Sequence, residues 1–192
     1  MLLSRDYQQI YSPRVLVYLS VEGEKREKLY FEAVARLLEA EGTSPFRLET
    51  DAEPGKSSPD QVIDRAKAFY RLHTYTNRVW LVMDADRGYL EQIEGRRGEI
   101  ETLGFMLGIS NPCFELWLRL HERDCDPSLT DASSYKAVNT FDLNTWGKEA
   151  RRDGINHAVR RAEALPGSAA TPFPGNPGTQ LAALFRYLGF GG

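Results

Sequence analysis

The sequence lacks any long apolar run, because its longest uninterrupted ones, such as residues 15–19, cover only five residues. A membrane-spanning helix needs about 20 consecutive apolar residues, so no membrane span is predicted. The apolar start at residues 1–3 is followed directly by the polar residues 4–6, which is not the pattern of a secretory signal peptide. We therefore expect a cytoplasmic protein without membrane contact.

Cysteine and excess positive charge are scarce as well. Cys113 and Cys125 are the two cysteines among 192 residues, and their spacing is not that of a CxxC motif. A reducing compartment and a packing role for Cys113 are the simplest interpretation. The 24 Lys and Arg residues are outnumbered by 27 Asp and Glu residues, giving a net charge of −3. Binding of nucleic acid would therefore need a local basic patch or bound cations.

What the sequence does contain is a succession of strand and helix patterns. Residues 14–20 and 78–83 are apolar on both faces, which predicts two central strands of a parallel sheet. Residues 24–41 and 58–73 have the periodicity of amphipathic helices, and the second begins with a capping-box pattern. Strands that alternate with helices predict an α/β fold.

The remaining elements are shorter. We predict further strands at 46–50 and 107–110, helices at 89–102, 112–121, 143–150, 155–165 and 179–188, and irregular structure at 124–139 and 166–177. A length of 192 residues is that of about one domain.

Acidic residues follow both central strands. Glu22 comes just after the first, while Asp84 and Asp86 end the second. Carboxyl ends of parallel strands lie at one edge of a sheet, and strand residues two apart point the same way, so the three carboxylates are expected to converge. Such a site suits Mg²⁺ or Mn²⁺ better than Zn²⁺. The alternative is that these acids are turn formers or helix caps.

Several segments of the chain resemble the RloB-like family. The run VEGEKREKLYF at 21–31 is similar to the family's opening EGxxxExxYF, and VMDAD at 82–86 is similar to its DxD strand. The most specific stretch is ISNPCFELWLRLH at 109–121, which matches SNPxFExWxxxH without a gap. Lys136 stands where the family has a lysine, and NPGT at 176–179 resembles its C-terminal segment. The resemblance extends over roughly residues 14–188.

This resemblance implies a Toprim-like fold, a small parallel sheet flanked by helices, with a helical C-terminal extension. The core would span about residues 12–123 and the extension about 124–192 of a single domain, 1–192. Toprim domains carry Mg²⁺-dependent phosphotransfer sites, and RloB-like proteins are associated with bacterial abortive-infection and anti-phage loci. The implied partners are DNA or RNA and an ABC-type ATPase, and the sequence leaves open whether the chain forms an oligomer.

The resemblance also implies roles for the acidic residues in a metal-dependent nuclease. Asp84 and Asp86 would ligate the metal, and Glu22 would be a ligand or the general base for the attacking water. Glu27 would serve a second cation, or it is a solvated charge on the first helical turn. Glu115 stands among apolar residues, so it is either a metal ligand or a buried carboxylate with a structural hydrogen bond.

Other residues are candidates for binding the substrate. Lys136 would contact the phosphate in the transition state, or it is an ordinary surface lysine. His121 would donate a proton to the leaving group, or it is structural. Ser110 and Asn111 precede a helix N-terminus, where they would hold an anion or cap the helix.

The one larger basic cluster includes Arg151 and Arg152, followed by Arg160 and Arg161. These residues would contact the nucleic-acid backbone, or they form a solvated charged face. The sequence departs from the family at Arg26, where a threonine is usual. A long cation at this point would pair with the nearby glutamates or contact phosphate.

Two other functions compete with a nuclease. One is a non-catalytic binding or regulatory subunit of a defence complex that keeps the Toprim fold. The other is an aspartyl-phosphate phosphatase with Asp84 as nucleophile and Asp86 as acid and base, which would leave Glu22 without a role.

Overall fold

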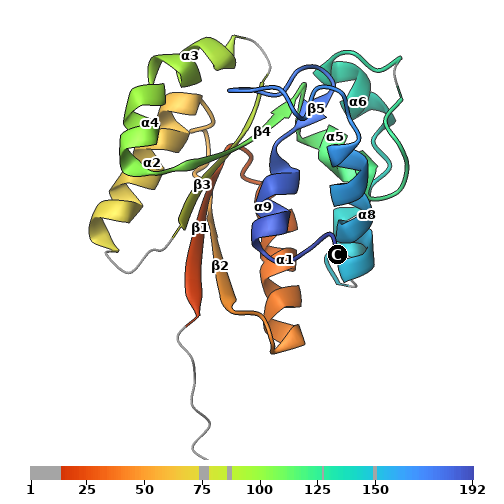
Figure 1. The fold of residues 1–192 in the computed structure, drawn as a ribbon, viewed down its shortest axis with the longest axis horizontal. Helices are drawn as coiled ribbons and strands as arrows, with labels where there is room; N and C mark the ends of the chain where they lie inside the picture. The colour runs from red at the N-terminus through yellow and green to blue at the C-terminus, as the bar shows by residue number, and fades with distance from the viewer. Residues whose placement is uncertain (1–13, 74–77, 86–87, 127, 149–150) are drawn as a thin grey trace, which may run out of the picture.

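A single mixed sheet organises the chain. The computed structural model describes residues 14–73, 78–85, 88–126, 128–148 and 151–192. Its strands lie in the order β2-β1-β3-β4-β5, with β1 to β4 parallel and β5 antiparallel to β4 (Figure 1). Their bounds are Val15–Val21 for β1, Phe46–Asp51 for β2, Arg78–Asp84 for β3, Met106–Asn111 for β4 and Gly178–Thr179 for β5. The predicted α/β class is confirmed, and the arrangement is consistent with a Toprim-like fold.

Helices cover both faces of the sheet (Figure 1). One face packs against α2 (Pro59–Leu72), α3 (Tyr89–Gly95) and α4 (Arg97–Leu103). The other packs against α1 (Arg26–Glu41), α5 (Phe114–Leu120), α8 (Arg152–Glu163) and α9 (Leu181–Tyr187). Two short helices, α6 (Ala132–Val138) and α7 (Leu143–Trp146), lie against α5 and α1 respectively. Within the described ranges, no helix has the length and apolarity that crossing a bilayer requires.

The two central strands are buried on both faces, as their sequences predict. In β1, Val17 and Leu19 point into the core beneath α1, while Tyr18 belongs to the core on the α2 side. In β3, Trp80 and Leu81 divide between the same two cores. Alternate side chains of a strand point to opposite faces, so each strand contributes to two apolar clusters at once.

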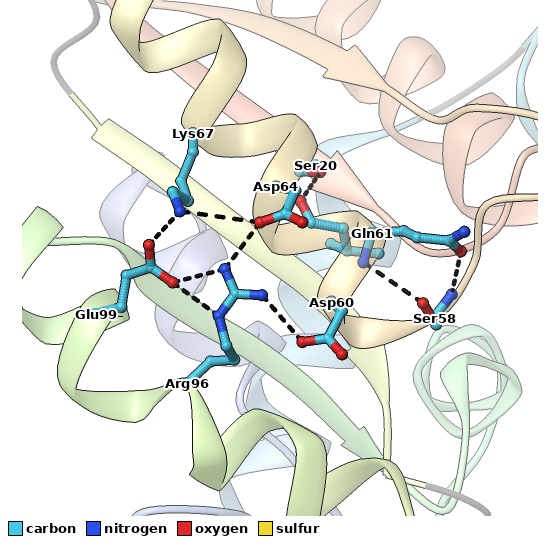
Figure 2. Close-up of polar contacts among 9 residues, drawn as sticks. Ser20, Ser58, Asp60, Gln61, Asp64, Lys67, Arg96 and Glu99 are labelled. Atoms are coloured by element: carbon cyan, nitrogen blue, oxygen red, sulfur yellow. Dashed lines mark hydrogen bonds and ion pairs between the residues drawn. The ribbon is translucent and has the colours of Figure 1, made fainter.

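On the face of the sheet that α2 covers, polar side chains hold the start of α2 and link α2 to α4 (Figure 2). The predicted capping box is present, because the Ser58 and Gln61 side chains each bond to the other residue's backbone N–H. Arg96 then joins α2 to α4 by ion pairs with acidic residues on both helices: Asp60, Asp64 and Glu99. These exposed pairs balance charge locally and contribute little stability each.

Some predicted elements differ from the observed ones. Residues 124–139 were expected to be irregular, but α6 lies there. Its N-cap is Asp131, whose carboxylate accepts the Ser134 N–H at 2.9 Å. The helix predicted at 89–102 is divided at Arg96 into α3 and α4. The final helix begins at Leu181 rather than 179, because Gly178–Thr179 pairs with β4. Both cysteines are free, and Cys113 is buried.

Candidate functional site

The carboxyl ends of β1 and β3 bring two of the predicted acids together. The strands are neighbours, with Val21 opposite Val82, so Glu22 and Asp84 lie at one edge of the sheet. The Glu22 Oε2 atom accepts the backbone N–H of Asp84 at 2.9 Å. Asp86 lies outside the described residues. The convergence that the strand pattern predicted is thus present for Glu22 and Asp84.

Asp84 also connects the sheet to α5. Its Oδ1 atom accepts the backbone N–H of Phe114, the first residue of α5, at 2.8 Å. The side chain is buried, with Asp84 as a whole only 7% exposed. This bond places the first turn of α5, which carries Glu115, beside the end of β3. The SNPxFE stretch therefore delivers a third carboxylate to the same edge.

Glu27 reaches the edge because the chain between β1 and α1 turns back on itself. A Cβ atom on Gly23 would lie 1.6 Å from Glu27 Oε2, so the glutamate carboxylate covers the position that any side chain at Gly23 would need. A side chain at Gly23 would therefore displace the flexible end of Glu27 from this position, although the backbone itself would tolerate it, since its φ is not in the left-handed region. The EGxxxE spacing thus folds the second glutamate back toward the first.

The acids influence one another strongly. Burial raises the pKa of Asp84 well above its usual value, and the negative charges of Glu22, Glu27 and Glu115 raise it further, while Lys136 lowers it. The pKa of Glu27 is raised by burial and by Glu115, and Lys136 and Arg26 oppose that rise. Four carboxylates and Lys136 therefore share one electrostatic environment, in which negative charge is in excess. We call Glu22, Glu27, Asp84 and Glu115 the acidic edge.

One cation reaches directly into the acidic edge. Arg26, at the start of α1, donates a hydrogen bond from Nη1 to Glu115 Oε1 on α5. The Arg26 side chain is 47% exposed and that of Glu115 is 6% exposed. The arginine thus reaches from solvent to neutralise a buried carboxylate. The sequence placed Arg26 near glutamates, but its partner is Glu115 rather than Glu22 or Glu27.

The acidic edge offers the right donor atoms for a hard divalent cation. Carboxylate oxygens suit Mg²⁺ and Mn²⁺, and mutual repulsion makes a compensating positive charge favourable at Asp84. Among the residues that the structure describes, no three His, Cys, Asp or Glu side chains form a ready metal site. The donor chemistry therefore fits such an ion, and the arrangement with Glu115 held by Arg26 would have to adjust to receive it.

Ser110 and Asn111 make contacts with the C-terminal part of the chain. The hydroxyls of Ser110 and Thr179 are 2.9 Å apart and both are buried. Asn111 Nδ2 donates to the carbonyl of Pro174 at 2.9 Å. These bonds attach the 166–177 loop and β5 to the end of β4. The side chains hold this loop rather than cap α5.

His121 lies away from the acidic edge, inside an aromatic cluster. Its Nε2 atom is 2.9 Å from the Tyr30 hydroxyl, which also accepts the Trp117 Nε1–H at 2.8 Å. Burial, with a smaller effect from Arg161, lowers the pKa of His121 to about 3. An imidazole with this pKa is neutral at physiological pH. We call Tyr30, Trp117 and His121 the aromatic cluster.

The basic residues of α8 are only partly available to a ligand. Arg152 makes two hydrogen bonds to the Glu41 carboxylate, at 2.8 and 2.6 Å, and its guanidinium lies over the Phe190 ring. Arg151 is exposed just before the helix. The two neighbouring arginines therefore differ, with Arg152 holding the C-terminal segment and Arg151 facing solvent.

Sequence reasoning missed two residues beside the acidic edge. The contact of the Glu27 carboxylate with the backbone at Gly23 could not be predicted, because a glycine's neighbours depend on tertiary structure. Arg119 lies one turn after Glu115 on α5, and its spacing of four residues was the available signal.

Comparison with known proteins identifies the chain at family level. A family model described as RloB-like protein matches residues 17–188, which is most of the chain. No curated protein and no solved structure matches.

Proposed function

Because the chain belongs to the RloB-like family, we propose that it is a divalent-metal-dependent nuclease of the Toprim type that hydrolyses phosphodiester bonds. The observation that carries this proposal is the acidic edge, where Glu22, Glu27, Asp84 and Glu115 meet at the carboxyl ends of parallel strands. We further propose that the protein acts in phage defence and that a partner ATPase regulates it.

Each residue of the acidic edge has a role in this proposal. Asp84 and Glu22 would hold a Mg²⁺ or Mn²⁺ ion, and Glu27 and Glu115 would complete the site or hold a second ion. When bound, such an ion activates water and stabilises the charge that develops on the leaving oxygen. Glu22 would alternatively accept the proton of the attacking water. Lys136, which lowers the pKa of both Asp84 and Glu27, would contact a phosphate oxygen of the substrate.

We propose that Arg26 has two positions, of which the structure shows the one paired with Glu115. In the described state its guanidinium neutralises Glu115. In the second position the arginine, which is 47% exposed, would leave Glu115 and contact the incoming phosphate. The phosphate would then pair with Arg26 while the cation pairs with Glu115. The buried Glu115 carboxylate would therefore not be left without a positive partner.

A cleavage assay with metal controls tests the proposal. The purified chain is incubated with single-stranded DNA, plasmid and RNA in Mg²⁺, Mn²⁺ or EDTA, beside Asp84→Asn and the matched control Glu99→Gln. Glu99 belongs to the exposed ion-pair group on α4. We expect cleavage that requires metal, persists in Glu99→Gln and disappears in Asp84→Asn. Cleavage in EDTA, or an active Asp84→Asn variant, would contradict the proposal.

A second candidate is a non-catalytic binding or regulatory subunit with the same fold. It is favoured by the Arg26–Glu115 pair and by the lack of a ready metal group among the described residues. Manganese binding followed by electron paramagnetic resonance separates the two. Binding that Asp84→Asn weakens supports the nuclease, whereas no binding by the wild-type chain, together with no cleavage when the partner ATPase is added, supports the binding subunit.

A further inference from the structure

The peptide group between Val21 and Glu22 lies at the point where β1 reaches the acidic edge. Its N–H, which belongs to Glu22, donates to the carbonyl of Val82 on β3 at 3.0 Å. Its C=O, which belongs to Val21, points the opposite way, as in any trans peptide, and so faces the β2 side of β1. The pairing of β1 with β2 ends at Ser20 and Asp51, one residue earlier. The Val21 carbonyl therefore lies just beyond the end of β2.

Arg65, from α2, donates to this carbonyl. Its Nη2 atom is 2.6 Å from the Val21 oxygen, and its Nε atom donates to the hydroxyl of Ser20 at 3.1 Å. Its Nη1 atom makes a longer bond, of 3.4 Å, to the carbonyl of Lys56 in the turn after β2. The buried Ser20 hydroxyl donates in turn to the Val62 carbonyl on α2 at 2.8 Å. One guanidinium thus connects α2, the end of β1 and the turn that follows β2.

The Glu22 carboxylate depends on the position of this same peptide. The pairing of β1 with β3 extends to Val21 opposite Val82, so the next β3 donor on that side, the Asp84 N–H, lies beyond the paired part of β1. The Glu22 Oε2 atom accepts this N–H at 2.9 Å. The side chain therefore fills the place that a strand carbonyl would have, and it reaches Asp84 only from a correctly placed backbone.

We infer that Arg65 is a positioning residue of the acidic edge, which holds the Val21 carbonyl and so fixes the peptide from which Glu22 reaches Asp84. The inference deepens the proposed function and rests on it, because it concerns the cation site that these two acids would form. The three hydrogen bonds of Arg65 go to a hydroxyl and two carbonyls, so its effect on the carboxylates passes through the backbone. A charged donor makes such bonds about twice as strong as neutral ones.

Hydrogen exchange of backbone amides, measured by NMR without any metal, tests the positioning directly. The readout is the exchange rate of the Asp84 N–H divided by that of the Leu19 N–H in the interior of β1. A general loss of stability raises both rates together, whereas a displaced Glu22 exposes the Asp84 N–H alone. We expect Arg65→Gln to raise this ratio about fivefold, which is the effect of losing one typical hydrogen bond.

Arg186→Gln is the matched control. Arg186 on α9 also bonds through all three of its guanidinium nitrogens, to the Glu163 carboxylate and to the Gly191 carbonyl. Its partners lie on α8 and in the C-terminal segment, and none of them belongs to the acidic edge. This variant should leave the exchange ratio as it is in the wild type.

Manganese affinity, followed by electron paramagnetic resonance, tests the consequence for the cation site. Residues that orient metal ligands typically change metal affinity 10- to 100-fold when they are replaced, so we expect Arg65→Gln to weaken manganese binding about tenfold. Arg186→Gln should bind manganese as the wild type does. Both variants are measured as folded protein, so a difference in stability alone does not change the result.

The following outcomes would overturn the inference. One is an unchanged exchange ratio in Arg65→Gln, and another is an equal rise in Arg186→Gln, which would indicate general loosening. A raised ratio with unchanged manganese affinity would make Arg65 a structural residue only. If Arg65→Gln does not fold by circular dichroism, Arg65→Lys decides, because a lysine has one nitrogen for the three acceptors. Its exchange ratio must exceed that of the wild type.

The inference and the proposed function fail in different ways. If the wild-type chain binds no manganese but Arg65→Gln raises the exchange ratio, the metal site is removed and Arg65 still positions Glu22. If the wild-type chain binds manganese and Arg65→Gln changes neither the ratio nor the affinity, the role of Arg65 is removed and the metal site remains.

Discussion

The helices α1 and α5 meet at two places that differ sharply in chemistry. At their first turns Arg26 pairs with Glu115, beside acids that repel one another. One turn further along α1, the Tyr30 hydroxyl is hydrogen-bonded to both Trp117 and His121, while the Nδ1 atom of His121 is buried without a partner. The same pair of helices thus carries a charged edge and an aromatic cluster only a few residues apart.

The difference lies in how polar groups are compensated. In the aromatic cluster, rings surround the polar atoms, with Tyr30 stacked on Trp146 at 4.7 Å and Trp117 stacked on Phe185 at 4.8 Å. Such packing stabilises the fold. At the acidic edge, burial and like charges raise the pKa of Asp84, which is a cost to the folded state. We therefore expect substitutions at the edge to change activity and those in the cluster to change stability.

The largest expected effect is that of Asp84→Asn. The amide still accepts the Phe114 N–H but cannot serve as an anionic metal ligand, so cleavage should fall at least about 100-fold. Removing one of several like charges should leave the melting temperature unchanged or raise it. Cleavage assays and thermal unfolding of the same preparation check both parts. A large loss of stability would remove the contrast between the two regions.

Tyr30→Phe tests the other side of the comparison. The hydroxyl accepts from Trp117 and bonds to His121, so its loss leaves buried polar atoms unpaired. We expect a loss of about 1–3 kcal/mol in unfolding free energy, with the turnover of folded protein unchanged. Urea unfolding measures the free energy of unfolding. Cleavage rates divided by the concentration of folded protein measure the turnover. Tyr70→Phe, at a partly exposed tyrosine, is the matched control and should have little effect.

The pH dependence of stability sharpens the comparison, because the two regions have opposite signs. Burial lowers the pKa of His121 from 6.5 to about 3, so the unfolded state binds more protons between these values. Stability from His121 is complete above pH 6.5 and is lost on acidification, by up to about 1.4 kcal/mol per pH unit. The pKa values of Asp84 and Glu27 are raised, so these groups favour the folded state as the pH falls.

The difference between wild type and His121→Gln isolates the histidine. Unfolding free energies from pH 7.5 to 4.5 should fall less steeply in His121→Gln, while His157→Gln, at an exposed histidine, should follow the wild type. Parallel curves for all three proteins would show that His121 is not the acid-sensitive group.

The smallest expected effect is that of Arg26→Gln. Without the guanidinium, Glu115 becomes available to a cation, so manganese should bind about 3- to 10-fold more tightly. Strand binding should weaken, since the arginine is also proposed to contact phosphate. Arg36→Gln, an exposed arginine on the same helix, is the matched control. Weaker manganese binding in Arg26→Gln would mean that the arginine supports the metal site rather than competing for it.

Much of the fold could be predicted because its signals are local. The strands β1 and β3 are apolar on both faces, and the capping box at Ser58 depends only on the four consecutive residues 58–61. The position of Glu22 beside Asp84 followed from parallel strands ending at one edge. In each case a pattern within a short stretch of sequence is enough to predict the local structure.

The rest depends on contacts between distant segments. Arg26 and Glu115 are 89 residues apart, and the choice of Glu115 over nearer glutamates depends on how α1 and α5 pack. The two-residue strand β5 is too short for a periodic signal and exists because it pairs with β4. The helix α6 did have a local signal, an aspartate cap at Asp131 followed by two serines, among polar residues typical of loops.

The strand order has a consequence for the making of the protein. In the sheet, β3 pairs with β1, and α5 follows β4 in the chain. The four carboxylates of the acidic edge therefore come from positions between 22 and 115. Chains emerge from the ribosome with the N-terminal part first. A nascent or prematurely stopped chain that ends before α5 carries Glu22, Glu27 and Asp84 but lacks Glu115 and Lys136. Under the proposed function, a chain that stops before α5 would therefore not cleave nucleic acid.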